Sequence, residues 1–174
     1  MRCLLPAALL CATLGMAGCS VLTPMVGWEL VKTGGAVALA YQPPGPSNTV
    51  HHGDAPVKDV CVEYNRDMPL DELVPALQAE LRSQGVQSRV YDVGAGQRDC
   101  AHWLRYVGSI EWGIPPLGQE HRAYLSAAAL SLHRADGRLL SSSAYVGDSG
   151  MGRWASTRKK IAPVVKALIT GFET

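Results

Sequence analysis

The chain has 174 residues, with 16 lysine and arginine residues against 15 aspartate and glutamate residues and an apolar share of 47%. This near-balance of charge argues against a nucleic-acid partner, because such proteins need a concentrated positive face. It also argues against adhesion to anionic lipid through charge alone. The length suits one domain with a single hydrophobic core.

The first segment has the build of a secretory signal. Arg2 is followed by an apolar run, residues 4–17, that ends on small residues before Cys19. An uncleaved membrane anchor is the alternative, but these 14 residues are fewer than the roughly 20 that a spanning helix needs. We therefore expect residues 1–18 to be a signal peptide, and no later apolar run reaches spanning length.

The end of this segment, Met16-Ala17-Gly18-Cys19, resembles the lipobox of bacterial lipoproteins, with Met16 in the place usually held by leucine. The resemblance implies that Cys19 is acylated and becomes the mature N-terminus. Ser20, rather than aspartate, resembles lipoproteins passed on to the outer membrane. We expect a protein that contacts the membrane through its lipid and faces the periplasm.

The five cysteines separate by position. Cys3 and Cys11 would leave with the signal peptide, and Cys19 would carry lipid. Cys61 and Cys100 remain, and in an oxidising compartment we expect them to form a disulfide. Two unpaired buried cysteines are the alternative. A catalytic thiol is not expected, because the chain has no Cys-x-x-Cys motif.

Residues 19–57 are predicted to be a lipid-anchored tether. Proline and glycine are frequent in residues 42–48 and 53–56, which is typical of loops. Residues 35–41 are rich in alanine and valine and form either an edge strand or a short helix, since their periodicity does not decide between the two. The domain is predicted to span residues 58–174.

A strand–helix–strand unit is predicted at the start of the domain. Residues 59–64 alternate between apolar and other side chains, which indicates a half-buried strand. A helix over residues 70–84 follows; Pro75 requires it to begin close before that residue, with Asp71 as a candidate cap. Gly85 ends the helix, and residues 86–93 form the second strand.

Three strands in a meander are predicted next, over residues 101–112, 120–134 and 138–146. Asp136-Gly137 is the strongest hairpin signal in the chain. A last helix carries an apolar stripe, and Pro163 is expected to kink or divide it. The order β-α-β-β-β-β-α predicts an α+β fold, a two-layer sandwich of one mixed sheet with two helices on one face.

No catalytic motif is complete. Residues 147–150, Gly-Asp-Ser-Gly, match the segment around the nucleophile of trypsin-like proteases, but the rest of that machinery is missing. Ser156-x-x-Lys159 and Lys32-Thr33-Gly34 occur in the reverse of their order in penicillin-binding enzymes. Gly94-x-Gly96 lacks the rest of a dinucleotide fingerprint. We predict no catalytic residue and no cofactor; an envelope serine hydrolase using Ser149 is the minor alternative.

The histidines do not have the spacing of a metal site. His51 and His52 are adjacent in a proline-rich segment, and adjacent residues rarely bind one ion well. His121 and His133 lie at opposite ends of one predicted strand, roughly 40 Å apart. No metal site is therefore predicted.

Trp103 and Arg105 are the predicted contact surface. They share one face of a predicted strand with Glu111, opposite the most apolar face. Tryptophans are more often core or rim residues than a ligand platform. Trp103 is therefore a contact residue only if the helices leave that face uncovered.

Several segments together resemble one family of small uncharacterised proteobacterial outer-membrane lipoproteins. They are residues 60–65, the helix through Leu81, Asp99-Cys100, and residues 153–157 with 160–163. The resemblance covers roughly residues 58–172 and contains no catalytic motif. It implies a two-layer α/β arrangement similar to the N-terminal domain of TolB and to LptE, and fold-level likeness of this kind is only an analogy for function.

The sequence thus predicts a non-enzymatic, lipid-anchored domain that binds an envelope protein or glycolipid at the outer membrane. An accessory lipoprotein that steadies a β-barrel assembly or transport complex, as LptE does, is the main alternative. No nucleic-acid partner is expected.

Overall fold

The computed structural model describes residues 42–53, 56–95, 100–147 and 149–171, all within the compact unit Ala40–Thr174. The predicted signal peptide, Cys19 and residues 35–41 lie outside the described residues. The elements in chain order are β1 (Ser47–His51), β2 (Asp59–Tyr64), α2 (Leu73–Ser83), β3 (Gln87–Asp92), β4 (His102–Gly113), β5 (Arg122–Arg134), β6 (Leu139–Val146), the 3-10 helix η1 (Met151–Trp154) and α3 (Thr157–Thr170).

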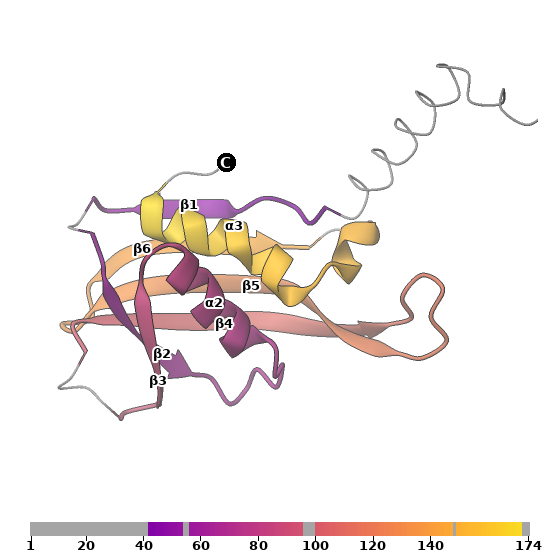
Figure 1. The fold of residues 1–174 in the computed structure, drawn as a ribbon, viewed down its shortest axis with the longest axis horizontal. Coiled ribbons are helices and arrows are strands. Elements are labelled where there is room, and N and C mark those ends of the chain that lie inside the picture. The colour runs from indigo at the N-terminus through magenta and orange to yellow at the C-terminus, as the bar shows by residue number, and fades with distance from the viewer. Residues whose placement is uncertain (1–41, 54–55, 96–99, 148, 172–174) are drawn as a thin grey trace, which may run out of the picture. The chain divides into compact units, whose positions relative to one another are not determined.

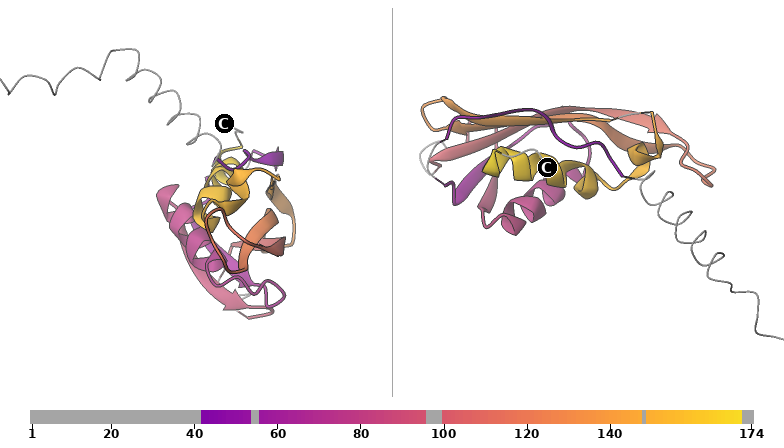
Figure 2. Two further views of the ribbon diagram at one scale, coloured as in Figure 1. Left: turned by 90° about the vertical axis from the view of Figure 1, so that its right-hand side faces the viewer. Right: turned by 90° about the horizontal axis from the view of Figure 1, so that it is seen from above.

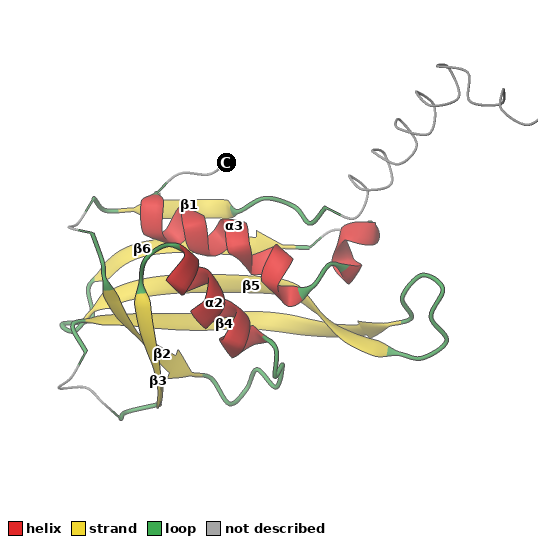
Figure 3. Ribbon diagram, viewed as in Figure 1, coloured by secondary structure: helices red, strands yellow, loops and turns green. Residues whose placement is uncertain are grey.

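The described strands form one mixed sheet of six strands in the order β1-β6-β5-β4-β2-β3. β2 is parallel to β3 and β4, whereas the β4–β5, β5–β6 and β1–β6 pairs are antiparallel. Both α2 and α3 lie on the same side of the sheet (Figures 1 and 2). The predicted α+β sandwich with two helices on one face is therefore confirmed (Figure 3).

The strand–helix–strand unit follows the sequence pattern closely. Val60 and Val62 of β2 are buried and face α2, and β2 and β3 are parallel. Pro75 is the third residue of α2, where a missing backbone N–H does no harm. The predicted cap was wrong, because Glu72 rather than Asp71 occupies the N-cap position and its side chain makes no capping bond. Gly85, with φ 76°, ends the helix as predicted.

The sequence prediction missed β1. This five-residue edge strand lies in the segment that was predicted as tether, and it pairs with β6. Ser47 donates its hydroxyl to the Ala144 carbonyl, and the hydroxyls of Thr49 and Ser143 are 2.9 Å apart. All these partners lie more than 90 residues further along the chain, so no local pattern marks the strand.

The last helix is continuous from Thr157 to Thr170, although Pro163 lies inside it. Of the two predicted effects of Pro163, the division into two pieces was therefore wrong, and a kink stays a prediction. Ser156 caps its N-terminus by accepting a bond from the Lys159 backbone N–H, and Gly171 ends it in the left-handed conformation. Proline removes only one backbone bond, whereas the buried face of α3 holds it against the sheet. The fully buried apolar residues of that face are Ile161, Val164, Val165, Ala167 and Leu168.

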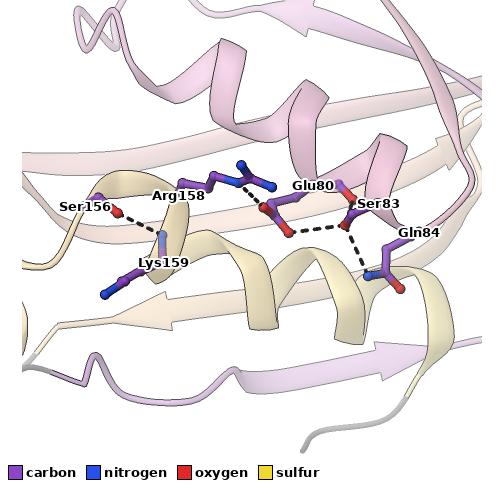
Figure 4. A network of polar contacts seen from close by, with 6 residues as sticks. All are labelled: Glu80, Ser83, Gln84, Ser156, Arg158 and Lys159. Atoms are coloured by element: carbon purple, nitrogen blue, oxygen red, sulfur yellow. Dashed lines mark hydrogen bonds and ion pairs between the residues drawn. The ribbon is translucent and has the colours of Figure 1, made fainter. Parts of the chain in front are cut away.

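The two helices are joined by a nearly buried carboxylate. Glu80 of α2 is 8% exposed, and its Oε1 lies 2.5 Å from Nε of Arg158 on α3. Ser83 donates its hydroxyl to the Glu80 carbonyl and contacts Oε2 (Figure 4). These bonds compensate the burial of the charge, which would otherwise destabilise the helix pair. None of the described helices has the length and apolar character needed to cross a bilayer.

The predicted disulfide between Cys61 and Cys100 is present. It joins β2 to Cys100, two residues before the first residue of β4, with Cα atoms 5.9 Å apart. Trp103 and Tyr91 pack against it and form a second, smaller buried cluster on the sheet face opposite the helices. The disulfide therefore fixes the start of β4 against β2 on the side of the sheet that α2 and α3 do not cover.

Replacing both cysteines with serine should lower the free energy of unfolding. The bond closes a loop of 39 residues, for which chain entropy gives a loss of about 4 kcal/mol. Urea unfolding of the wild type and the double variant measures this difference. The reduced wild type is the control and should unfold at the same midpoint as the variant. An unchanged midpoint in the variant would contradict the prediction.

Candidate functional site

The sheet face opposite α2 and α3, here called the outer face, carries the predicted contact residues. Trp103 and Arg105 of β4 alternate with Leu104 and Tyr106, which point into the main core under the helices. In the part of the chain that the structure describes, no helix lies over the outer face (Figure 2). The helices therefore leave this face uncovered, which is the condition that the sequence analysis set for a contact surface here.

Trp103 itself is not displayed on that surface. It is 8% exposed and packs against the disulfide and against Tyr91, with the ring centroids 6.1 Å apart. A buried indole offers little area to a partner. The expectation for Trp103 as a contact residue therefore does not fit the structure, because the disulfide draws the side chain into a local core.

Arg105 is displayed. Its side chain is 54% exposed, and its Nε lies 3.1 Å from Oε2 of Glu63 on the neighbouring strand β2. An ion pair this open to water contributes at most about 1 kcal/mol. Arg105 can therefore exchange Glu63 for an anionic group of a partner at little cost.

A shallow groove of about 300 Å³ begins at Arg105 and crosses the outer face. Its floor is formed by residues of β4, β5 and β6 whose side chains are short, with Asn48 of β1 at its border. The lining residues of these strands that point outward are Val107, Ala129, Ser131, Ser142 and Ala144. The floor is therefore apolar with two hydroxyls, and a cationic group stands at one end.

Lys160 is a buried charged residue that the sequence pattern did not single out. It is 1% exposed, and its Nζ donates to the Leu125 carbonyl at 2.8 Å and to the Arg153 carbonyl at 2.5 Å. The ammonium also lies 5.2 Å from the ring centroid of Tyr124 and 5.9 Å from that of Tyr145. Burial lowers the pKa of Lys160 to about 8. The sequence did contain an indication of this burial. Lys160 lies four, seven and eight residues before Val164, Ala167 and Leu168, and so on the same apolar stripe of the helix.

Lys160 joins three elements at one end of the sheet. Its two carbonyl partners belong to β5 and η1, so α3 is tied to both. Trp154, the last residue of η1, packs on Tyr124 with ring centroids 4.9 Å apart. The Tyr124 hydroxyl donates to Glu111 at 2.7 Å, and this bond raises the pKa of Tyr124. The result is a fixed platform beneath the hairpin that joins β4 to β5.

The other residues that the sequence singled out do not gather into a site. The Ser149 carbonyl accepts a bond from Arg153, which makes the segment a local turn before η1. His51 accepts from the Gly53 N–H, and His133 contacts Ser131 and the Gly137 carbonyl, so both imidazoles are engaged locally. Among the described residues, no group of three or more His, Cys, Asp and Glu side chains is placed to hold a metal ion.

Comparisons with known proteins give no family. No protein-family model matches the chain, and no curated protein matches it. Two solved structures are similar in part, both of the PelC dodecamer from Paraburkholderia phytofirmans, one of them a point variant. Each has 13% sequence identity and a TM-score of 0.44; they cover 71% and 74% of this chain and 96% and 97% of their own. At this distance the likeness says nothing of function.

The buried ammonium predicts an unusual dependence of stability on pH. The pKa of Lys160 is about 8 in the folded protein and 10.5 in the unfolded chain, so between these values the unfolded chain binds more protons. The free energy of unfolding should then rise with pH, by about 2 kcal/mol between pH 7.5 and 9.5. Chemical denaturation across this range measures the rise.

Lys160→Met should lack that rise, because methionine fills the space without titrating. Lys159→Met, at an exposed position on the same helix, is the matched control and should keep the wild-type dependence. Parallel curves for the wild type and Lys160→Met would show that the buried ammonium does not control stability in this range.

Proposed function

We propose that the protein is a lipid-anchored lipoprotein of the cell envelope whose domain binds an envelope protein or glycolipid and catalyses no reaction. The anchor rests on the lipobox-like sequence that ends at Cys19. The binding role rests on one observation, the groove of about 300 Å³ on the outer face with Arg105 at its end. The expected binding site is the outer face of the sheet. The domain as a whole is expected to lie in the periplasm, attached to the outer membrane.

The groove suits recognition because it is built on strands rather than loops. Its lining comes from four strands, β1, β4, β5 and β6, which are hydrogen-bonded to one another in one sheet. A rigid surface loses little conformational entropy on binding, so the interactions that it makes count toward affinity. Aliphatic groups of a partner would lie on the alanine floor, and an anionic group would pair with Arg105.

A photoreactive amino acid at Val107 tests this role in intact cells. Val107 is 61% exposed at the groove, so we expect a crosslinked adduct from this position. The same amino acid at Lys159, exposed on α3, should give none. Mass spectrometry of the adduct distinguishes a glycolipid from a protein, and a β-barrel protein there would indicate the accessory role.

A groove-filling variant sharpens the test. Ala129→Leu should reduce crosslinking from Val107 at least fivefold, because the longer side chain occupies the groove floor. Ala135→Leu, at an exposed turn outside the groove, is the matched control and should leave it unchanged. Equal adducts from residues 107 and 159, or no effect of Ala129→Leu, would contradict binding at this face.

Replacing Cys19 with alanine should release the protein from membranes into the soluble periplasmic fraction. The acyl chains that anchor a lipoprotein contribute about 0.8 kcal/mol per buried CH₂, and their loss leaves no comparable attachment. Fractionation of cells that express the wild type and Cys19→Ala measures the shift. Tight membrane association of Cys19→Ala would refute the anchor. A mass of the wild-type protein that includes residues 1–18 and no added hydrocarbon would also refute it.

A further inference from the structure

The hairpin between β4 and β5 exposes a cluster of apolar side chains. Its tip, residues 112–121, projects from the end of the sheet, at the right of Figure 1. Within it Trp112 is 69% exposed, Ile114 is 50% exposed and Leu117 is fully exposed. Pro115 and Pro116 lie between them. In the described part of the chain these side chains are thus half or more exposed, and the tip presents apolar groups to its surroundings.

Leu117 is held in an unfavourable backbone conformation. The turn is closed by a bond from the Gly118 N–H to the Pro115 carbonyl, and Leu117 is its third residue with φ 64°. Glycine or asparagine usually occupies this position, because a β-carbon is strained there. The chain thus combines backbone strain with an exposed leucine. Strain of this kind points to a role outside the folding of the domain.

The hairpin is supported firmly at its base. The position where a β-carbon of Gly113 would lie is 3.2 Å from the Trp154 ring, so any larger residue at this position would require the indole to shift by a few tenths of an ångström. Trp154 in turn packs on Tyr124, which is bonded to Glu111 across the two strands. The base of the hairpin is therefore fixed by these contacts, while its tip extends beyond them.

The chain enters the described domain beside this platform. A β-carbon at Gly152 would lie 2.6 Å from the Gln42 carbonyl oxygen, so Gln42 lies against η1, the same short helix that supports the hairpin. Gln42 is 23 positions after Cys19, and a chain of that length spans at most about 80 Å. Gln42, the first described residue, and the base of the hairpin thus lie at the same end of the domain.

The composition of the tip favours a lipid interface over a charged partner. Tryptophan is enriched where a bilayer meets water, and leucine, isoleucine and proline are apolar. Glu120 and Arg122, where the tip meets β5, carry opposite charges. A guanidinium nitrogen of Arg122 also lies 3.7 Å from Oε1 of Glu72. Binding would therefore depend on insertion of apolar side chains rather than on anionic lipid.

We propose that the hairpin tip inserts into the interfacial layer of the bilayer that holds the acylated Cys19. This contact rests on the proposed lipid anchor and adds a second, reversible attachment that fixes the orientation of the domain on the membrane.

The test uses the mature protein purified from cells and placed in vesicles of phosphatidylethanolamine and phosphatidylglycerol. An environment-sensitive fluorophore is attached at Gln119→Cys, which leaves Trp112, Ile114 and Leu117 in place. The matched control carries the fluorophore at Ala135→Cys, in the exposed turn at the opposite end of β5. We expect lipid-borne quenchers to reduce emission at residue 119 at least threefold more than at residue 135, also at high salt.

Leu117→Asn in the Gln119→Cys protein should abolish that difference. Asparagine tolerates the positive φ, so the turn is kept while the apolar group is lost. Emission at residue 119 that responds only to aqueous quenchers would overturn the proposal. Emission shielded from both aqueous and lipid quenchers would show a protein partner over the tip and would also overturn it.

A mass measurement separates this proposal from the lipid anchor. A protein without added hydrocarbon refutes the anchor alone, and its hairpin is then tested by adding the same vesicles to it. Lipid quenching at residue 119 in that protein would support insertion by the tip itself. Its absence there would overturn the proposal independently of Cys19.

Discussion

Lys160 places a charged ammonium among backbone carbonyls and aromatic rings rather than beside a carboxylate. Removing this group from water is unfavourable, and the lowered pKa expresses that penalty. The carbonyls of Leu125 and Arg153 compensate part of it and are themselves satisfied by the same group. The contact therefore couples α3, β5 and η1, and it does so at the point where the regular pairing of β4 and β5 is interrupted.

That coupling explains why one end of the sheet carries a rigid projection. Because η1 is held by Lys160, Trp154 is held over Tyr124 and Gly113. The strands of the hairpin then leave the sheet with a defined direction, although no helix covers their tip in the described part of the chain. The two faces of the sheet differ in a related way. One is filled by large aliphatic side chains under the helices, and the other keeps short side chains around Arg105.

The sequence predicted those features that depend on local chemistry. Alternation gave the strands, Asp136-Gly137 gave the β5–β6 hairpin, with φ 88° at Gly137, and the compartment expected from the signal peptide gave the disulfide. It missed features that depend on distant partners. β1 exists through its pairing with β6, and Trp103 is buried through the disulfide and Tyr91. Lys160 can be buried only because β5 and η1 bring their carbonyls to it.

The geometry of β4 connects the groove with the hairpin tip. Arg105 and Trp112 lie on the same strand, seven residues apart, which is about 23 Å in an extended strand. With the tip in the bilayer interface, and with the strand directed away from it, Arg105 would lie well outside the headgroup layer. A lipid still seated in the bilayer would then not reach the groove. The partner of the outer face would be the periplasmic part of a protein, or a glycolipid already withdrawn from the membrane.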